Sequence, residues 1–380
     1  MNTEYQLNWR EIMAKSQVYF TDFRTEFHGK SLLHKMQKLM KKAGFENIDF
    51  DGKFVAIKMH FGEVGNLAFL RPNYAKAVAD YVKELGGKPF LTDCNTLYVG
   101  GRRNALDHLD TAALNGFSQI STGCQILIGD GLKGDDEVDV PVPNGRHFRT
   151  AKIGRAVMDA DIIISLTHFK GHEKMGIGGA VKNIGMGCGS RAGKMEMHSD
   201  GKPQVAAAKC VGCGICAKNC AFAALTLTNG KMTIDHAKCA GCGRCFTACP
   251  KDALVATWEQ QDKILDEKTA EYAAAVLHGR PHFHISLLCD ITPNCDCHGE
   301  NDAAILPDIG MLAGFDPVAL DVAACDLCNQ APRLDNSWLD DCPHSDDVFN
   351  DAHDNTRWRD TIDYAVEIGL GCDEYELIRM

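Results

Sequence analysis

Eight cysteines between residues 210 and 249 carry the clearest chemistry in this sequence. They form two runs with the spacing C-x2-C-x2-C-x3-C, namely Cys210, Cys213, Cys216 and Cys220, and then Cys239, Cys242, Cys245 and Cys249. Three cysteines at two-residue gaps can surround one cubane iron–sulfur cluster, and the fourth points away toward a second. We therefore predict two 4Fe-4S clusters, one held by Cys210, Cys213, Cys216 and Cys249 and the other by Cys239, Cys242, Cys245 and Cys220.

The two runs belong to an internal repeat that is typical of two-cluster bacterial ferredoxins. The pair Lys209 and Cys210 in the first half matches Lys238 and Cys239 in the second. A zinc ribbon would use four ligands in pairs, and disulfides would suit a small secreted chain rather than one of 380 residues. Proline follows only the second run, but it forms a turn and is not a ligand, so the prediction does not depend on it.

Polar residues also follow several predicted strands. Strands are predicted at 54–59, 89–92, 162–166 and 284–288, and they end at His60, at Asp93 with Cys94, at His168 and at Asp290. In open α/β sheets, ligands bind at the carboxyl ends of parallel strands. We expect these side chains to line one crevice.

The glycine-rich segment that begins at His168 is the densest in candidate groups. His168 and His172 have the four-residue spacing that lets two histidines chelate a metal on a helix. The glycines at 176–190 would let backbone amides approach a phosphate or carboxylate beside Lys182. The alternative is a tight turn with surface histidines. The residues expected to bind substrate or cofactor and to supply protons are His168, His172, Lys182 and His198, with Asp93 and Asp290 orienting or ligating.

A second candidate metal site lies in the loop 290–298. Cys295, Cys297 and His298 lie within four residues and offer ligands for iron or zinc, joined by Cys188 or Cys94 from elsewhere. An unliganded, reduced loop is the alternative, because C-x-C alone specifies little. No complete Walker A loop is present, and no G-x-G-x-x-G follows a predicted strand.

Alternating strands and helices flank the cysteine runs on both sides. This predicts an α/β fold with a mixed, mainly parallel sheet, helices on both faces, and a small α+β ferredoxin-like insert. The expected division is 16–205 for the first part of the α/β domain, 206–257 for the insert, and 258–380 for the second part with its C-terminal helices. Residues 1–15 read as an N-terminal extension.

Composition narrows the classes of function. The net charge is −11, which argues against a nucleic-acid-binding protein and disfavours an anionic membrane surface. No apolar run reaches the length of a membrane span, and no secretion signal is visible. The 18 cysteines then favour a reducing cytoplasm, and exposed clusters favour an anaerobe.

Together these motifs resemble the DUF362 family of uncharacterised iron–sulfur centre proteins. The resemblance rests on H-F-G-E at 60–63, T-D-C-N-T-L-Y at 92–98, H-F-K-G-H at 168–172, G-G-A-V-K-N-I-G-M-G at 178–187, D-I-T-P-N-C-D-C-H at 290–298, and D-P-V-A-L-D at 316–321. It covers about residues 16–330 and implies a cytosolic redox role without a settled substrate. A fainter similarity, in the order of His172, Lys182 and His198, is to nickel-pincer lactate racemases, where a lysine holds the cofactor and histidines ligate nickel and move protons.

The leading hypothesis is an oxidoreductase or electron-transfer protein in which two 4Fe-4S clusters pass electrons to a site in the α/β domain. Its expected partners are a redox protein and a small anionic substrate. A pure electron carrier or assembly factor is the first alternative, but a carrier does not need the rest of the chain. A nickel-dependent isomerase is the second.

Overall fold

The computed structural model describes residues 15–98, 100–199, 202–220, 222–239, 241, 244–255 and 262–380. The predicted N-terminal extension, apart from Lys15, and the predicted cluster ligand Cys242 lie outside these residues.

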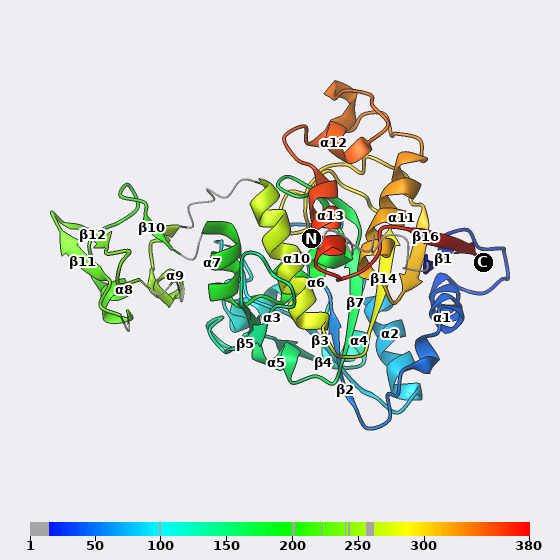
Figure 1. The fold of residues 1–380 in the computed structure, drawn as a ribbon, viewed down its shortest axis with the longest axis horizontal. Coiled ribbons are helices and arrows are strands. Elements are labelled where there is room, and N and C mark those ends of the chain that lie inside the picture. The colour runs from blue at the N-terminus through cyan, green and yellow to red at the C-terminus, as the bar shows by residue number, and fades with distance from the viewer. Residues whose placement is uncertain are drawn as a thin grey trace, which may run out of the picture.

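An eight-stranded sheet forms the centre of the molecule (Figure 1), with the strand order β16-β1-β15-β14-β7-β2-β3-β4. Its strands are β1 (Ser16–Asp22), β2 (Phe54–Lys58), β3 (Lys88–Asp93), β4 (Gln125–Ile128), β7 (Ile162–His168), β14 (His282–Leu288), β15 (Gly310–Gly314) and β16 (Tyr375–Arg379). Only β15 runs against its neighbours, pairing antiparallel with β1 and β14, whereas the other neighbouring pairs are parallel. The predicted mixed, mainly parallel sheet is therefore confirmed.

Helices cover both faces of this sheet, as predicted. The main helices are α1 (Leu32–Lys42), α2 (Pro72–Glu84), α3 (Ala105–Leu114), α6 (Ala180–Cys188), α7 (Arg191–Ser199), α10 (Asp262–Leu277), α11 (Pro317–Asn329) and α13 (Trp358–Glu367). Short helices are α4 (Gln119–Thr122), α5 (Arg155–Met158), α8 (Ile215–Lys218), α9 (Arg244–Ala248) and α12 (Val348–Ala352), with 3-10 turns η2 (Phe45–Asn47) and η3 (Trp338–Asp341). Apolar residues of α1 and α2 form one core layer with the sheet, and those of α6, α10, α11 and α13 form the other.

Local sequence explains these elements. All seven residues of β7 are buried, as expected for an apolar strand in the middle of a parallel sheet. Helix α2 begins at Pro72, whose fixed φ suits the first helical position, and ends before Gly86, which has φ +85°. Strands β15 and β16 were not predicted. Strand β15 was missed because its few apolar residues lie between two glycines.

Four antiparallel strand pairs lie outside the large sheet among the described residues, and two of them are hairpins of the α/β part. Strand β5 (Glu137–Pro141) pairs with β6 (Thr150–Gly154). Strand β8 (Lys170–His172) pairs with β9 (Gly176–Gly178). The segment 168–172 is therefore extended, and the helical spacing considered for His168 and His172 is wrong.

Residues 202–255 form a small unit that projects from one side of the large sheet (Figure 1). It contains two short antiparallel pairs, β10 (Gln204–Val205) with β13 (Leu254–Val255) and β11 (Leu225–Thr228) with β12 (Lys231–Ile234). The second pair turns at Asn229, with φ +51°, and Gly230, as the N-G signal predicts. The domain division itself stays a prediction.

The start of α6 is capped by a carboxylate from another helix. Asp321 of α11 accepts hydrogen bonds from the backbone N–H groups of Ala180, at 2.6 Å, and Val181, at 3.0 Å. A Cβ on Gly179 would lie 2.4 Å from the Asp321 carboxyl, so only glycine fits here. The amides that we expected to meet a phosphate or carboxylate ligand are thus satisfied by the protein's own Asp321.

We predict that Asp321→Asn lowers the free energy of unfolding by about 1–3 kcal/mol, because one accepting oxygen becomes an NH2 group facing a backbone N–H. Urea unfolding followed by tryptophan fluorescence measures this. The exposed Asp335→Asn serves as the control and should change the free energy by less than about 0.5 kcal/mol. A fully stable Asp321→Asn protein would show that the carboxylate cap is not needed.

Candidate functional site

A cavity of about 580 Å³ lies at the carboxyl ends of β2, β3 and β7. The hairpin β8–β9, helices α6 and α7, Leu265 of α10 and the loop 297–300 complete its wall. Its polar lining consists mainly of Lys58, His60, Glu63, Asp93, Cys94, Arg102, His168, Lys170, His172, Glu173, Lys182, Asn183, Lys194, His198, Cys297 and His298. The parallel strands thus bring together residues that are far apart in the sequence.

Most residues singled out from the sequence meet in this cavity. Asp93, His168, His172, Lys182 and His198 all line it. Asp290 follows β14 but is not among the lining residues, and its backbone N–H donates to Asp308 instead. The roles proposed for these side chains stay predictions.

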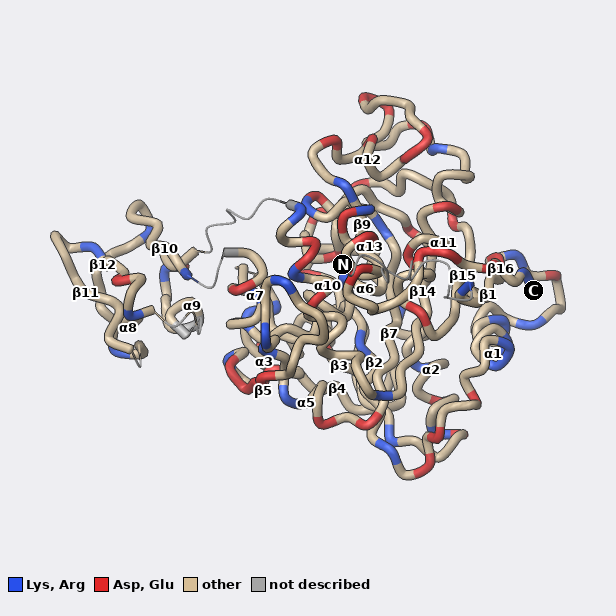
Figure 2. The backbone as a smooth tube through the Cα atoms, in the orientation of Figure 1, with Lys and Arg blue, Asp and Glu red and all other residues tan. Residues whose placement is uncertain are grey.

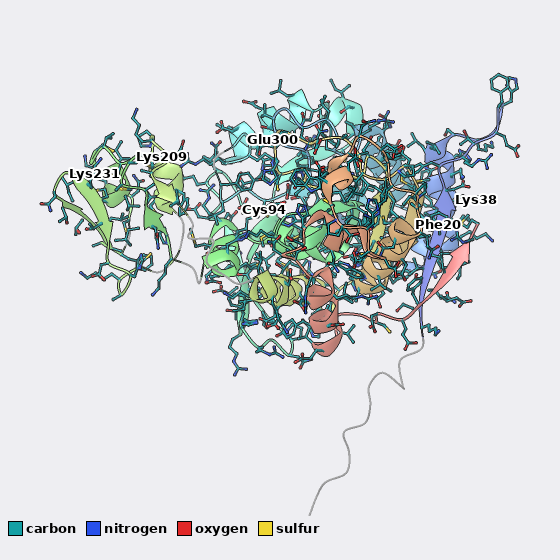
Figure 3. The ribbon with its side chains drawn as sticks, turned by 90° about the horizontal axis from the view of Figure 1, so that it is seen from above. Phe20, Lys38, Cys94, Lys209, Lys231 and Glu300 are labelled. Atoms are coloured by element: carbon teal, nitrogen blue, oxygen red, sulfur yellow. The ribbon has the colours of Figure 1, made fainter. Side chains whose placement is uncertain are left out.

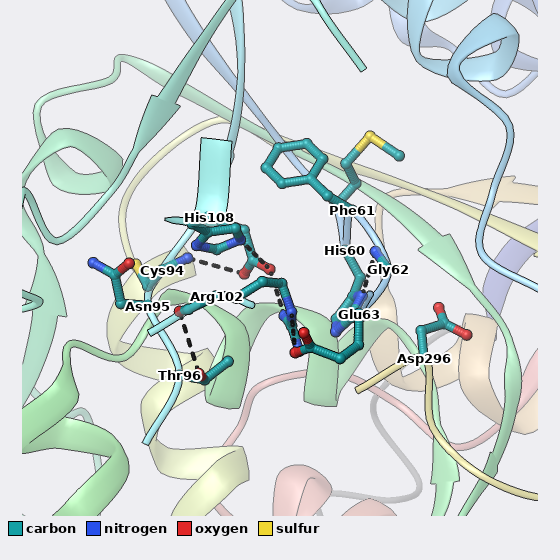
Figure 4. A network of polar contacts seen from close by, with 12 residues as sticks. His60, Phe61, Gly62, Glu63, Cys94, Asn95, Thr96, Arg102, His108 and Asp296 are labelled. Atoms are coloured by element: carbon teal, nitrogen blue, oxygen red, sulfur yellow. Dashed lines mark hydrogen bonds and ion pairs between the residues drawn. The ribbon is translucent and has the colours of Figure 1, made fainter. Parts of the chain in front are cut away.

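Buried ion pairs hold one wall of the cavity, seen in part in Figure 4. Lys58 Nζ lies 3.0 Å from Asp93 Oδ1 and 2.8 Å from Asn183 Oδ1. Arg102 bridges two acids, with Nε 3.2 Å from Glu63 Oε2 and Nη1 3.4 Å from Asp93 Oδ2. Since a buried charge without a partner is costly, these pairs depend on one another.

The pairing sets the charge of its members. Burial alone would raise the pKa of Asp93, but Lys58, His108, His60 and Arg102 outweigh it and hold that pKa well below its usual range. Burial lowers the pKa of His108 to about 3, although Asp93 opposes the shift. Asp93 is therefore a carboxylate and His108 a neutral ring at neutral pH.

A second group surrounds Asp296, which lies between the two cysteines of the C-D-C loop. His168 Nδ1 lies 2.8 Å from Asp296 Oδ1, and His168 Nε2 lies 2.8 Å from the carbonyl oxygen of Cys289. Lys170 Nζ lies 3.3 Å from the other Asp296 oxygen. Both ring nitrogens of His168 thus face acceptors, so His168 offers no free lone pair to a metal.

The C-D-C loop meets β8 in a candidate metal site. Ligand atoms of His172, Cys295 and Cys297 all lie within 4.8 Å of one another, and so do those of Glu173, Cys297 and His298. Neither Cys94 nor Cys188 belongs to a ligand group among the described residues. The donor set of two thiolates, a carboxylate and imidazoles suits zinc or iron.

The hydrogen bonds of these residues limit how they can bind a metal. His172 Nδ1 accepts from the backbone N–H groups of Lys174 and Met175, both at 3.1 Å, so in the neutral ring Nε2 carries the hydrogen. A metal would therefore bind the two thiolates readily, but His172 would have to lose or redirect that proton. Lys182 Nζ donates to Cys295 Sγ at 3.2 Å, which provides a cation beside the thiolate.

The two thiols of the C-D-C loop, those of Cys295 and Cys297, have pKa values shifted in opposite directions. A hydrogen bond from Cys297 lowers the pKa of Cys295, and the ammonium groups of Lys182 and Lys170 lower it further against the effect of burial. Burial alone would lower the pKa of Lys182, but Cys295, Cys297 and Glu173 outweigh it and raise that pKa. Lys182 is thus a fixed cation rather than a nucleophilic amine.

Helix α7 separates the cavity from the small unit 202–255. Its residues Lys194 and His198 line the cavity, and burial, with help from His172, Lys182 and Lys194, lowers the pKa of His198 to about 3. On the same helix, Arg191 is buried, and this burial lowers the pKa of its guanidinium, although Asp130 opposes the shift. Among the described residues, Nε and Nη1 of Arg191 have no hydrogen-bond acceptor.

The described cysteines of the two runs fit thiolate ligands. Backbone N–H groups donate to Cys210 Sγ from Gly212 and Met232, both at 3.4 Å, and to Cys249 Sγ from Ala253, at 3.3 Å. Burial raises the pKa of Cys216, and the neighbouring thiols of Cys249 and Cys213 raise it further. These three belong to the same predicted ligand set, which stays a prediction together with its partner.

Several residues of the site were missed from the sequence, above all the lining residues Lys58, Arg102 and Lys170, and Asp296, which contacts His168 and Lys170. One signal existed for Lys58, since a lysine inside the otherwise apolar strand F-V-A-I-K needs a buried partner. No local signal marks Arg102, because its partners Glu63 and Asp93 come from other loops.

The fold and cavity define an α/β protein with a candidate metal site at the carboxyl edge of its sheet. Residues 55–326 match the family described as DUF362, a domain of unknown function, and the chain belongs to this family. Within the described residues, no helix is both long and apolar enough to span a membrane.

A thylakoid-associated protein of Synechocystis sp. is 28% identical over 162 residues, or 42% of this chain and 46% of that protein. The lactate racemase apoprotein of Thermoanaerobacterium thermosaccharolyticum has a TM-score of 0.33 and 10% identity over 72% of this chain and 51% of its own. A Thermotoga maritima protein has a TM-score of 0.39 and 12% identity over 79% and 58%. The chain thus spans about half the length of the proteins it matches.

Asp130, which follows β4, predicts a pH dependence of stability. Its Oδ1 accepts from Asn95 N and Nδ2, at 2.9 and 2.8 Å, while burial raises its pKa to about 6 against Lys194, Asn95 and Arg191. Between pH of about 4 and 6 the folded protein keeps a proton that the unfolded chain has lost, so stability falls as the pH rises, by up to about 3 kcal/mol.

Asp130→Asn should remove the share of this decrease that comes from Asp130, because the amide keeps the oxygen that Asn95 uses and cannot ionise. A second buried acid, Asp321, whose pKa burial raises to about 7, keeps its own share in both proteins. Urea unfolding at pH values from about 4 to 7 gives the slope. The exposed Asp159→Asn should retain the slope of the parent protein. Equal slopes for parent and Asp130→Asn would contradict the raised pKa.

Proposed function

We propose that this protein is a cytoplasmic iron–sulfur oxidoreductase. Two 4Fe-4S clusters held by the cysteine runs would supply single electrons at low potential when bound. The chain's own cavity would bind a small anionic acceptor and supply its protons. The observation that carries this proposal is helix α7, whose Lys194 and His198 line the cavity and whose Met195 belongs to the same apolar cluster as Cys245 and Cys249 of the cysteine runs.

Charge supports an anionic acceptor. The cavity wall contains more lysine and arginine side chains than carboxylates. The charges of Lys58 and Arg102 are neutralised by Asp93 and Glu63. Lys182, in contrast, donates a hydrogen bond to Sγ of Cys295. A carboxylate or similar group entering the cavity would gain a charge-assisted hydrogen bond from Lys182.

The chain also provides groups for proton transfer. His198 is neutral at neutral pH and lines the cavity. His168 is held in place by Asp296 and the Cys289 carbonyl, so its position is fixed relative to the C-D-C loop. A metal at Cys295 and Cys297 would supply Lewis-acid or redox chemistry at this point, with Glu173 or His172 as further ligands.

An isomerase related to nickel-pincer racemases is the second candidate, because His172, Lys182 and His198 all line one cavity. The raised pKa of Lys182 weighs against it, since a protonated lysine cannot attack a cofactor. Nickel in the purified protein together with a mass adduct on Lys182 would favour this candidate. A pure electron carrier would not need the cavity at all.

The cluster assignment predicts about eight iron atoms per chain after anaerobic purification, from two four-iron cubanes. Cys220→Ser should retain one cluster and about four iron atoms, by iron assay and electron paramagnetic resonance. The half-buried Cys342, which lies outside the two cysteine runs, offers a control, because Cys342→Ser should leave the iron content unchanged. Fewer than about four iron atoms in the parent would rule out the two-cluster proposal.

Lys182→Met should slow acceptor reduction while leaving the clusters intact. Reduced methyl viologen serves as the electron donor and small 2-oxo acids as acceptors. Loss of the charged hydrogen bond should lower kcat/KM by about tenfold to hundredfold. Lys263→Met, at an exposed position of α10, is the matched control and should retain full activity.

The same experiment separates the enzyme from the carrier. If the parent reduces no small acceptor, and both variants pass electrons to acceptor proteins at the parental rate, the cavity has no part in the reaction. The proposal of an oxidoreductase would then be wrong, and electron carriage would replace it.

A further inference from the structure

The small unit 202–255 differs in charge from the rest of the chain. It contains six lysines, one arginine and two aspartates, although the whole chain has a net charge of −11. Its first part, residues 202–234, has four lysines and no acidic residue. Figure 2 shows these basic positions on the projecting unit, and Figure 3 labels Lys209 and Lys231 there.

Apolar side chains are exposed in the same part, around a predicted cluster ligand. Cys213 is exposed, and its neighbours Val211 and Ile215 have 61% and 38% of their surface accessible. Leu227, 58% accessible, packs against this loop, since a Cβ on Gly212 would lie 3.2 Å from its Cδ1. We call Val211, Cys213, Ile215 and Leu227 the apolar patch.

Lysines surround the apolar patch. Lys209 precedes it and Lys218 follows it on α8, and both side chains are exposed. Lys231 donates to the carbonyl oxygen of Cys210 at 2.5 Å, which places its charge beside the first cysteine run. A patch of apolar residues inside a ring of cations is the composition of a docking surface for an acidic protein.

The other cysteine run faces the large domain instead. Helix α9, which carries Cys245, lies between α8 and helix α7 of the large domain (Figure 1), and Arg103 of that domain forms an ion pair with Asp252. Leu97 and Met195 of the large domain belong to one apolar cluster with Cys245 and Phe246, and this cluster extends to Cys210 and Cys216 of the first run. The first run is therefore the outer one, and the second lies next to α7.

From this arrangement we propose that the apolar patch and its lysines, Lys209, Lys218 and Lys231, bind an acidic one-electron carrier protein. This inference rests on the proposed function and names its electron donor. The reduced carrier gives up one electron and the outer cluster accepts it, with no bond formed or broken and no proton moved. The electron then passes to the inner cluster beside α7.

Two other occupants fit the observations less well. A second copy of this chain would place two cationic patches against each other, which costs several kcal/mol for like charges in contact. An anionic membrane would be repelled by the large domain, which carries the excess of acidic residues. A carrier protein contacts only the small unit and avoids that repulsion.

Binding of an acidic flavodoxin to the anaerobic, cluster-containing protein tests the proposal. The affinity, measured by calorimetry, should fall at least tenfold between ionic strengths of about 0.05 and 0.5 M, because salt screens exposed charges. The double variant Lys209→Glu with Lys218→Glu should bind at least tenfold more weakly at low salt and with little salt dependence. Its reduction by methyl viologen, which needs no docking, should be unchanged.

The matched control reverses two exposed lysines of α1, Lys38→Glu with Lys42→Glu, far from the small unit (Figure 3). This protein has the same net charge as the test variant and should bind flavodoxin like the parent. Equal binding by parent and test variant, or equal loss in both variants, would overturn the proposal. So would binding of the patch lysines to phosphatidylserine vesicles without any flavodoxin binding.

The proposed function fails separately from this inference. A protein without iron, or one whose iron is not reduced by methyl viologen, contradicts the iron–sulfur oxidoreductase whatever it binds. If viologen reduces the protein fully, but the Lys209→Glu and Lys218→Glu substitutions do not change its affinity for flavodoxin, only the docking surface is contradicted.

Discussion

Charged groups that leave water must meet partners of opposite charge, and this requirement shapes the carboxyl edge of the sheet. Lys58 is the buried last residue of the interior strand β2, and it is accommodated because Asp93 ends the neighbouring strand. Arg102 then joins Asp93 to Glu63. The parallel arrangement of β2, β3 and β7 is what brings these partners within reach, so fold and charge pairing depend on each other.

Around this framework the chain places its reactive groups with fixed geometry. His168 is held by Asp296, and the same aspartate accepts from Lys170, so the C-D-C loop is tied to β7 and β8 through charge rather than through apolar packing. Its two thiols consequently sit at a defined place in the wall. Asp321 secures the opposite wall by capping α6, the helix that carries Lys182.

The sequence was sufficient for the elements with strong periodic or spacing signals. The buried strand β7 occurs where the residues predicted it, and so do the strand ends at His60, Asp93 and His168 that line the cavity. Two kinds of feature could not be predicted from the local sequence. Strand β15 has too few apolar residues to signal a strand, and partnerships such as Arg102 with Glu63 join loops whose proximity exists only in the folded sheet. Two of the amides expected to meet a phosphate or carboxylate at the glycine-rich segment, those of Ala180 and Val181, are used by Asp321 from a distant helix, which no local pattern could signal.

Helix α7 has a consequence for energetics that goes beyond its place as a wall. Its cations Arg191 and Lys194 are three residues apart, which is less than one helical turn, and they share one electrostatic environment. Negative charge added beside one of them is therefore felt at the other. If the proposed cluster and anionic acceptor bind on either side of this helix, thermodynamic linkage requires their effects to be reciprocal. An anion in the cavity would make the cluster harder to reduce, and an electron on the cluster would weaken binding of the anion to the same degree.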